Sequence, residues 1–277
     1  IRDDDFDDVI GQLKGLRPVD IADAIELVEP EGLWRLLERL PKRAEIFSYL
    51  KAEQQVELSS LFPRAILVKI ISEMPADERT DLFKRIDQGL RDALFPALAQ
   101  AERENIRKLS AYVEGTAGAL MTSDYAMHRQ DMTAAEAHSS LRREAPDAET
   151  IYHAYVTDDE RTLIGVVSLR ELILAHPAKQ IKDLMISDLV SGYVDDDQEN
   201  IAKRIARYDL IALPITDNFG HLVGIVTHDD ARDVASEEAT DDFHKSAGVT
   251  TSLGNMKRAR TSLLYRKRVF WLVLLVF

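Results

Sequence analysis

The sequence predicts a multidomain α and α/β protein, with an all-α superhelical N domain, an α/β module made of two repeats, and a long connecting helix. Two observations predict this fold. Prolines recur among apolar residues at helical spacing through residues 1–115, and a pattern of about 60 residues occurs twice after Gly118. At a loose prior of about 150 residues per domain, the 277 residues leave room for two domains.

Residues 1–115 are expected to form a stack of short helices. Pro18, Pro30, Pro41, Pro63 and Pro75 divide this region into segments such as GLWRLLERL and AILVKIISEM, whose apolar residues have helical rather than alternating spacing. Proline is tolerated in the first turn of a helix but disrupts its interior. We therefore expect each proline to begin a new helix of about ten residues, in a solenoid-like layer.

The second half of the chain contains a repeat. Leu163–Glu171 reads LIGVVSLRE, and Leu222–Asp230, 59 residues later, reads LVGIVTHDD. A β-rich run precedes each copy, and further upstream the segments MTSDY and MISDL each come before a helical stretch. Each half therefore reads strand, helix, strand, turn, strand, helix, and the two copies are expected to form one α/β unit.

This repeat resembles the cystathionine-β-synthase (CBS) domain, and two such domains in tandem form a Bateman module. The resemblance implies CBS domain 1 over 118–183 and CBS domain 2 over 184–240. In this family the Ser or Thr and the acid lie where a strand ends and a helix opens, and they can bind adenosine phosphates and ribose. The N–H groups at a helix N-terminus suit phosphate. The first copy departs from the family pattern, because Glu171 stands where Asp is usual.

Composition excludes several classes of protein. Lys and Arg total 35 against 48 Asp and Glu, so the net charge of −13 disfavours nucleic-acid binding and attracts cations. The absence of cysteine excludes disulfides, thiolate catalysis and Cys-based metal sites. The seven histidines lack the HExxH spacing, and neither a GxxxxGK loop nor a GxSxG elbow occurs. We therefore expect no enzymatic activity, and a membrane-tethered hydrolase is disfavoured.

The C-terminal end is basic and then apolar. No acid occurs from Phe243 to Arg268, and Val269–Phe277 reads VFWLVLLVF directly after a basic cluster. Spanning a bilayer takes about 20 apolar residues, but a basic cluster beside a Trp is typical of a cytoplasmic membrane interface. We expect 266–277 to be the start of a truncated transmembrane helix. The alternatives are a C-terminal core helix and nucleic-acid binding through Lys257–Arg268, which the adjacent apolar end disfavours.

Acidic residues cluster within 77–81, 195–199 and 229–242. The third cluster contains a single base, Arg232. Spacings of 3, 4 and 4 put Asp230, Asp233, Glu237 and Asp241 along one helical face. Like charges so placed destabilise a helix by roughly 0.2–0.5 kcal/mol per pair. Helix caps would also explain the first two clusters, and a solvated helix side would explain the third.

The combination of features resembles the MgtE family of magnesium channels. It consists of proline-punctuated helices, a CBS pair containing AGALMT at Ala117 and APDAETIY at Ala145, an EEATDDFHK segment, and a basic entry into an apolar end. The resemblance implies a homodimer formed through the CBS domains at the inner membrane of the cell, with this region on the cytoplasmic side. A plug or connecting helix over 241–265 would lead to the transmembrane pore domain.

The resemblance also implies Mg²⁺ sites. Mg²⁺ prefers oxygen ligands and keeps several waters while using one or two carboxylates directly, so loose clusters between domains are favoured over a closed cage. One group of ions would lie between the N domain and the CBS and plug segments, and another site would lie within CBS domain 2. The implied metal-binding residues are Glu45, Asp77, Asp81, Asp229, Asp230, Asp233, Glu238, Asp241 and Asp242 for the first group, and Glu199, Asp209 and the carbonyl of Ala206 for the second.

An adenine-nucleotide-sensing module is the main alternative function. Leu210 stands where an aromatic residue would help by stacking on the base. The two readings are compatible, since the MgtE resemblance itself implies an ATP site. The residues that would hold or approach the nucleotide are His153, Ser168, Arg170, Glu171, Thr227 and Asp230.

Charge suggests how Mg²⁺ would act. Two carboxylates about 4 Å apart repel by about 1 kcal/mol in water and about 4 kcal/mol at an effective dielectric of about 20. We expect the acidic faces to separate without Mg²⁺ and to close when it binds. Closure at high cytosolic Mg²⁺ would shut the pore, which is negative feedback by the transported ion.

Overall fold

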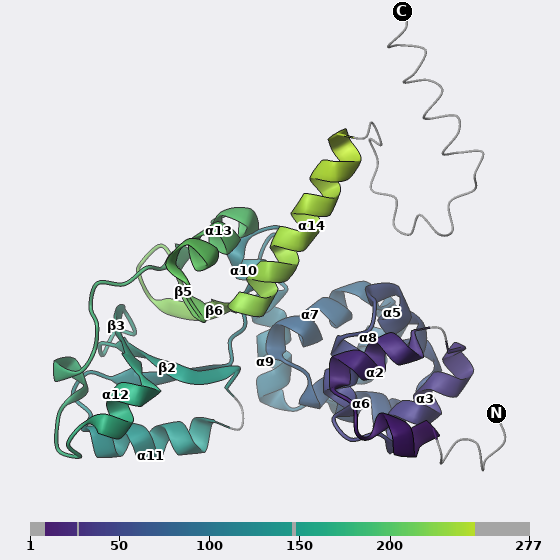
Figure 1. Cartoon of the computed structure of the whole chain (residues 1–277), viewed down its shortest axis with the longest axis horizontal. Coiled ribbons are helices and arrows are strands. Elements are labelled where there is room, and N and C mark those ends of the chain that lie inside the picture. The colour runs from purple at the N-terminus through teal and green to yellow at the C-terminus, as the bar shows by residue number, and fades with distance from the viewer. Residues whose placement is uncertain (1–8, 27, 146–147, 247–277) are drawn as a thin grey trace, which may run out of the picture.

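The computed structural model describes residues 9–26, 28–145 and 148–246, and in addition leaves the side chains of 31 and 241–246 undescribed. Figure 1 shows a helical N-terminal part, an α/β part, and a helix, α14 (His228–Ser246), that extends from the α/β part. The predicted fold class is confirmed. Most of the connecting helix predicted over 241–265, and all of the transmembrane start predicted at 266–277, lie outside the described residues.

Short helices build the N domain, and proline explains where several of them begin. Pro18 and Pro30 occupy the first turn of their helices, and Pro63 and Pro75 lie at the N-cap. Pro41 instead lies two residues before its helix begins. The helices are α2 (Pro18–Ile25), α3 (Pro30–Arg39), α4 (Arg43–Ser48), α5 (Ala52–Leu61), α6 (Arg64–Glu73), α7 (Ala76–Arg85), α8 (Gln88–Leu94) and α9 (Gln100–Leu109), with a short 3₁₀ turn, η1 (Phe95–Ala97), between the last two.

Most N-domain helices pack against the second helix along the chain, α2 on α4, α3 on α5, α4 on α6, α5 on α7 and α7 on α9. This pattern is that of a superhelical stack. One continuous apolar core runs through it, with Leu37, Ile46 and Phe47 fully excluded from solvent. Proline does not mark every helix, since α5 begins after Lys51 and α8 after Asp87, whose carboxylate accepts a hydrogen bond from Leu90 N–H.

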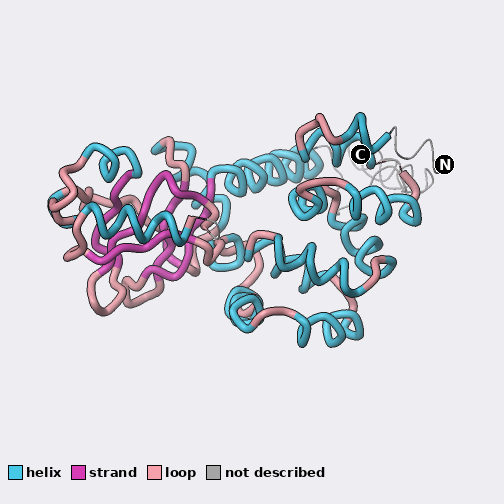
Figure 2. The backbone as a smooth tube through the Cα atoms, turned by 90° about the horizontal axis from the view of Figure 1, so that it is seen from below, coloured by secondary structure: helices cyan, strands magenta, loops and turns pink. Residues whose placement is uncertain are grey.

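The predicted repeat forms two similar three-stranded sheets, in each of which the first pair of strands is parallel and the second antiparallel. Figure 2 shows these strands gathered at one end of the molecule and the N domain at the other. The first half contains β1 (Tyr125–Arg129), α11 (Ala134–Glu144), β2 (Thr150–Thr157), β3 (Leu163–Ser168) and α12 (Leu169–Leu174). The second contains β4 (Gly192–Tyr193), α13 (Gln198–Tyr208), β5 (Ala212–Thr216), β6 (Leu222–Thr227) and α14; the short α10 (Ala117–Leu120) and η2 (Ile181–Asp183) precede the two halves.

The segment that leads into each half packs on the sheet of the other half. Thr122 pairs with Ile225 in β6, and Ile186 pairs with Val166 in β3. The side chain of Met121 lies directly over Gly224, where a Cβ atom would be 2.4 Å from its sulfur. The sequence analysis treated each half as continuous, so this exchange was not predicted. It binds the two halves into one unit.

Candidate divalent cation site between the N domain and the CBS pair

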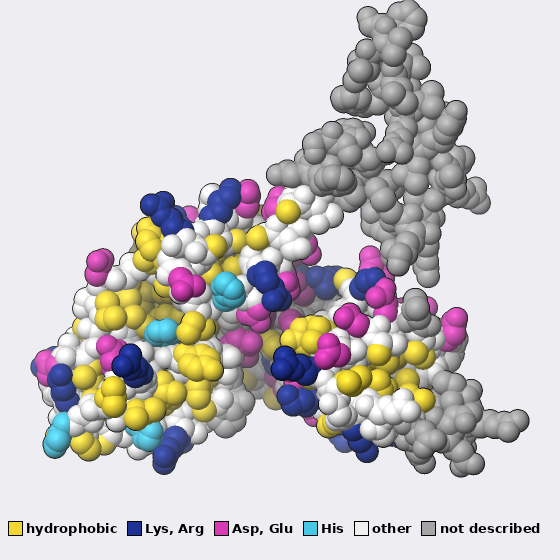
Figure 3. Space-filling model, viewed as in Figure 1, with side chains coloured by type: hydrophobic (Ala, Val, Ile, Leu, Met, Phe, Trp, Pro, Cys, Tyr) yellow, Lys and Arg dark blue, Asp and Glu magenta, His cyan; other side chains and the backbone are white. Residues whose placement is uncertain are grey.

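The first turns of α7 and α14 carry the acids that form the candidate site. Pro75 is the N-cap of α7, so Asp77 and Glu78 fall in its first turn, where the helix dipole stabilises negative charge. Helix α14 follows β6 directly and places Asp229 and Asp230 in its own first turn. The two helix starts face each other where the N domain meets the second CBS domain. Figure 3 shows acidic side chains gathered in the hollow between these parts.

Asp77 is the most strongly perturbed of these groups. Burial raises the pKa of its carboxyl well above the ordinary value, and the nearby charges of Asp230, Glu149 and Glu78 raise it further. Its Oδ1 atom is excluded from solvent and has no hydrogen-bond partner within the described part of the chain. A buried, unpartnered carboxylate oxygen costs free energy, which a cation could remove.

Glu78 has the same character. Burial raises its pKa to about 7, with further contributions from Asp230, Asp229 and Asp81, while the hydroxyl of Ser48 acts in the opposite direction. Its Oε2 atom is also buried and lacks a hydrogen bond from any described group. The sequence analysis placed Glu78 in an acidic cluster but did not include it among the metal-binding residues.

Asp230 faces this pair from α14. Burial raises its pKa to about 6, the Thr227 hydroxyl opposes this shift, and Asp229 and Asp233 add to it. Thr227 donates a short hydrogen bond from Oγ1 to Asp230 Oδ2. Because Thr227 comes immediately before α14, the contact holds the carboxylate at the start of the helix.

Glu149 is a fourth carboxylate at the site, and the sequence analysis missed it. It lies just before β2, where its N–H donates to the Asp124 carbonyl at 2.7 Å. The residue as a whole is exposed, but partial burial of its carboxyl, together with the charges of Asp230, Asp229 and Glu78, raises its pKa to about 7. The acid lies outside the three clusters that the sequence analysis identified, so neither periodicity nor clustering distinguished it. The motif APDAETIY was the one sequence feature that pointed to this segment.

Acids from three segments therefore face one another at this site. Their oxygens suit a hard divalent cation such as Mg²⁺, and the unpartnered atoms of Asp77 and Glu78 favour one over a purely structural role. Among the described residues, no three Asp, Glu or His side chains already converge as a closed metal cage. The arrangement fits an ion held largely through water.

Asp81 and Glu45 lie at the edge of this site and already have basic partners. Asp81 lies 3.2 Å from Arg85 and 3.6 Å from Lys84, and it shares a cleft of about 340 Å³ with Asp230 and Asp233. Glu45 is exposed and pairs with the neighbouring Lys42 at 3.1 Å.

Tyr49 senses the charges of both Glu45 and α14. Burial raises the pKa of its phenol, and both Glu45 and Asp229 contribute to the shift. On α14 itself, Asp229 and Asp233 are exposed and Glu238 is half-buried. The side chains of Asp241 and Asp242 lie outside the description, so their predicted roles stay predictions.

The second predicted metal site is not assembled within one chain. Glu199 lies in the first turn of α13 and Asp209 is its C-cap residue. At about 1.5 Å per residue, the helix separates them by about 15 Å, too far for one ion to contact both. Ala206 lies one turn before Asp209, and Glu199 forms an ion pair with Lys203 at 2.7 Å.

Comparison with known proteins bears directly on this architecture. Residues 16–115 match the family model described as the MgtE intracellular N domain, and residues 117–177 and 181–237 match the CBS domain model. A crystal structure titled as the cytosolic domain of the Mg²⁺ channel MgtE in complex with ATP has 37% sequence identity and a TM-score of 0.78, over 81% of this chain and 93% of that one. This chain belongs to the MgtE family.

Curated MgtE proteins match along almost the whole chain. The magnesium transporter MgtE of Thermus thermophilus is 38% identical over 273 residues, and that of Bacillus subtilis is 31% identical over 272 residues. Both alignments cover more than nine-tenths of this chain but 60% of the relative, so the chain spans about three-fifths of their length. These relatives are transporters, which confirms the prediction that this MgtE region is not an enzyme.

In the residues described for this MgtE chain, no helix combines the length and the apolar character that crossing a bilayer requires. The membrane segment predicted at 266–277 lies outside those residues, so it stays a prediction.

Three of the predicted nucleotide residues of this MgtE chain line a separate cavity of about 590 Å³, which the first CBS domain forms together with Ile211 of the second. His153, Ser168 and Arg170 line it, together with Tyr152 and Ile211. The exposed ring of Tyr152 is an aromatic wall that the sequence analysis sought at Leu210. Burial lowers the pKa of His153, which favours its neutral form.

In each repeat the Ser or Thr hydroxyl is hydrogen-bonded to the acid three residues later. The Ser168 hydroxyl donates a hydrogen bond to Glu171 Oε2 at 3.0 Å. The same hydroxyl accepts a hydrogen bond from Glu171 N–H, and this reciprocal pair caps α12. Thr227 and Asp230 form the corresponding contact at α14. Thr227 does not line the cavity in the first CBS domain, so the structure does not bring it together with His153 and Arg170 there.

Proposed function

We propose that this chain is the Mg²⁺-sensing regulatory region of a magnesium channel or transporter, in which binding of Mg²⁺ between the N domain and α14 closes the domains and shuts the pore. The observation that carries the proposal is the pair Asp77 and Asp230, half-buried acids at the starts of α7 and α14, because Asp77 Oδ1 is closed to solvent without a described partner and Asp230 is among the charges that act on it. The relatives compared above are named as a magnesium transporter and as a Mg²⁺ channel, which supports the choice of ion.

Electrostatics explains why the site would respond to Mg²⁺. The raised pKa values of Asp77, Glu78 and Asp230 show that their ionised forms are unfavourable when the domains are in contact. At neutral pH ionised carboxylates push α7 and α14 apart. Bound Mg²⁺ supplies positive charge that cancels this repulsion. The ion therefore binds the closed arrangement more tightly than the open one, and this difference in binding free energy shifts the equilibrium towards closure.

Helix α14 is the element that would carry the change onward. It begins at the acidic site and continues without interruption to Ser246, so a shift at its first turn is transmitted along a rigid rod. We place the connecting helix and the membrane-embedded pore after it, with the region described on the cytoplasmic side of the inner membrane. We also propose a homodimer formed through the CBS domains.

Small-angle X-ray scattering and limited proteolysis of this chain test the proposal. We expect the radius of gyration to fall and the segment around 110–117 to resist cleavage when millimolar Mg²⁺ replaces EDTA. A monovalent chloride salt at matched ionic strength is the control, because screening alone would act on all charges. A radius that does not change with Mg²⁺ contradicts the proposal.

ATP binding at the CBS pair is a second candidate function. The cavity beside His153 and Arg170 is of the size that ligands occupy, with an aromatic wall and a cationic group, and a relative is titled as a complex with ATP. Equilibrium titration of ATP with and without Mg²⁺ tests it. Saturable binding that survives removal of Mg²⁺ supports a nucleotide site, and absence of binding contradicts it.

A further inference from the structure

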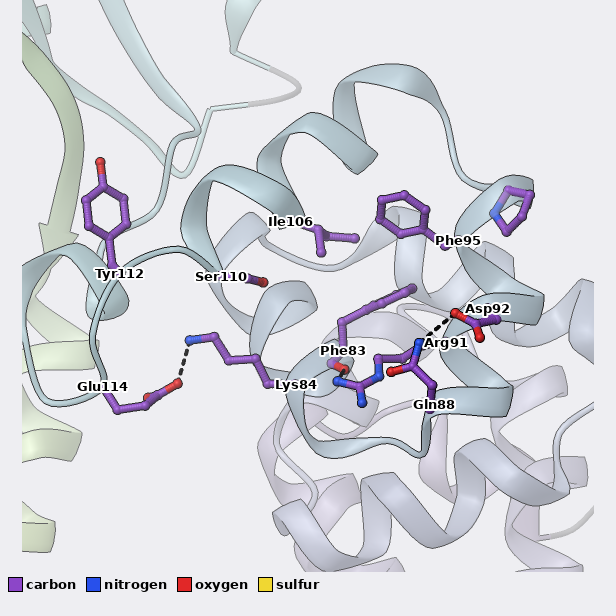
Figure 4. Close-up of a pocket in the computed structure, with 11 residues that line it drawn as sticks. Phe83, Lys84, Gln88, Arg91, Asp92, Phe95, Ile106, Ser110, Tyr112 and Glu114 are labelled. Carbon is purple, nitrogen blue, oxygen red and sulfur yellow. Dashed lines mark hydrogen bonds and ion pairs between the residues drawn. The ribbon is translucent and has the colours of Figure 1, made fainter.

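The N domain carries a cavity that neither the acidic site nor the nucleotide site uses. It has a volume of about 800 Å³ and lies among α7, α8, η1, α9 and the segment that leads to α10. Figure 4 shows Phe83, Phe95, Ile106 and Tyr112 around it, so much of its wall is aromatic or aliphatic. This size and this lining are typical of pockets for small molecules.

Arg91 gives the cavity an anion-binding group. Its Nε atom is excluded from solvent and has no acceptor among the described residues. The guanidinium makes a distant contact of 3.4 Å from Nη1 to the Phe83 carbonyl, which is longer than a usual N–H···O hydrogen bond. A buried guanidinium nitrogen without an acceptor is costly. Because Nε is closed to solvent, an anion in the cavity would meet the terminal Nη atoms of this half-buried side chain, whose planar fork of donors suits a carboxylate or phosphate.

The other polar groups at the cavity already have hydrogen-bond partners. Lys84 lies 2.6 Å from Glu114, and Gln88 donates to Asp92 at 2.7 Å. Figure 4 shows both contacts at the margin of the cavity. No acid forms an ion pair with Arg91 in the part of the chain that is described, although the neighbouring Asp92 keeps its negative charge.

The cavity also joins the N domain to the CBS pair. Tyr112 forms one wall, and its ring packs so closely on Gly118 that a Cβ atom there would lie 2.5 Å from it. Gly118 lies in α10, and its own N–H donates a hydrogen bond to the carbonyl of Val194 in the second CBS domain. An occupant would therefore contact the N domain on one side and, through Tyr112, a wall fixed to the CBS pair on the other.

We propose that this cavity is a binding site for a small organic anion, a carboxylate or phosphate ester with an aromatic or branched apolar body. The anionic group binds Arg91, and the apolar body packs on Phe95, Ile106 and Tyr112. The site is separate from the Mg²⁺ and ATP proposals and stands without them.

Phenyl phosphate and inorganic phosphate are the probes, titrated calorimetrically into this chain in EDTA. We expect phenyl phosphate to bind at least about tenfold more tightly than inorganic phosphate, because the ring buries apolar area. Arg91→Gln should weaken phenyl phosphate binding by about tenfold or more, as expected for a lost hydrogen bond to a charged group. Arg35→Gln, a matched change at an exposed N-domain arginine beside Trp34, should leave binding unchanged.

Two further variants keep the test decisive. Ser110→Phe fills the cavity from its exposed rim while keeping Arg91, so it should also abolish binding, even if Arg91→Gln folds poorly. Arg170→Gln removes the cationic group of the CBS cavity and should have no effect. The proposal is overturned if phenyl phosphate does not bind, if phosphate binds equally well, or if Arg170→Gln rather than Arg91→Gln and Ser110→Phe abolishes binding.

Discussion

Burial and, next to it, the carboxylate of Asp230 in the first turn of α14 raise the pKa of Asp77 in the first turn of α7. Two helix N-termini from different domains thus direct acids at one another. Either acid alone would be a favourable helix-dipole contact. Together they form a strained contact in the absence of a cation, and the account of regulation follows from that strain.

Neutralising either acid should remove the response to Mg²⁺. We expect Asp77→Asn and Asp230→Asn to abolish most of the Mg²⁺-dependent compaction measured by scattering. In EDTA both variants should unfold at a higher temperature than the parent chain, because a buried repulsion is relieved.

Asp20→Asn is the matched control, since Asp20 is an exposed acid in the first turn of α2. It should leave compaction intact and lower stability slightly through loss of a favourable dipole contact. If Asp20→Asn blunted compaction as strongly as Asp77→Asn, general surface charge rather than the site would control the response.

Stability without Mg²⁺ should fall as the pH rises from about 4.5 to about 7. The pKa of Glu78 is raised from 4.5 to about 7 in the folded chain, and that of Glu149 is raised likewise. In this window the folded state binds more protons than the unfolded state, so the free energy of unfolding decreases with pH. Thermal unfolding in EDTA measures this slope. Glu78→Gln should make it shallower, and an unchanged slope would mean that Glu78 is ionised freely in the folded state.

Glu149→Gln tests a residue that the sequence did not single out. Its carboxyl joins the first CBS domain to the acidic site, so its loss should shift the compaction midpoint to higher Mg²⁺, by roughly threefold to tenfold for an interaction of about 1 kcal/mol. Glu160→Gln changes an exposed acid in a turn of the same domain and should shift nothing. A Glu149→Gln midpoint equal to that of the parent would exclude this residue from the site.

The sequence predicted the elements of this fold better than their contacts. Proline positions and the repeated LIGVVS and LVGIVT segments predicted most helices and both sheets, because these features act locally. Glu149 was missed because its place at the site depends on how β2 and α14 lie in space. Glu199 and Asp209 lie at opposite ends of α13, a separation that helix geometry fixes once the helix boundaries are known, so their predicted role in a metal site stays a prediction.

The exchange between the two CBS halves makes Gly224 sensitive to substitution. A Cβ atom there would lie 2.4 Å from Met121 Sδ and 2.8 Å from the Thr122 carbonyl, whereas at Gly165 the nearest atoms all belong to the flexible side chain of Met185. We expect Gly224→Ala to cost about 1–3 kcal/mol in the free energy of unfolding, and Gly165→Ala to cost less. Gly11→Ala, which has no atom within 4 Å, is the control and should not destabilise. Equal stability of all three variants in denaturant titrations would contradict close packing of each entry segment on the sheet of the other CBS half.

The central claim is that Mg²⁺ binds between α7 and α14. Crystals of this chain grown with Mn²⁺ in place of Mg²⁺ test it most directly, because anomalous scattering locates the ion. The account predicts an anomalous peak between Asp77 and Asp230, either in direct contact at about 2.1 Å or one water layer away. A structure with abundant Mn²⁺ in which these two residues lie apart, with no peak near either, would contradict it.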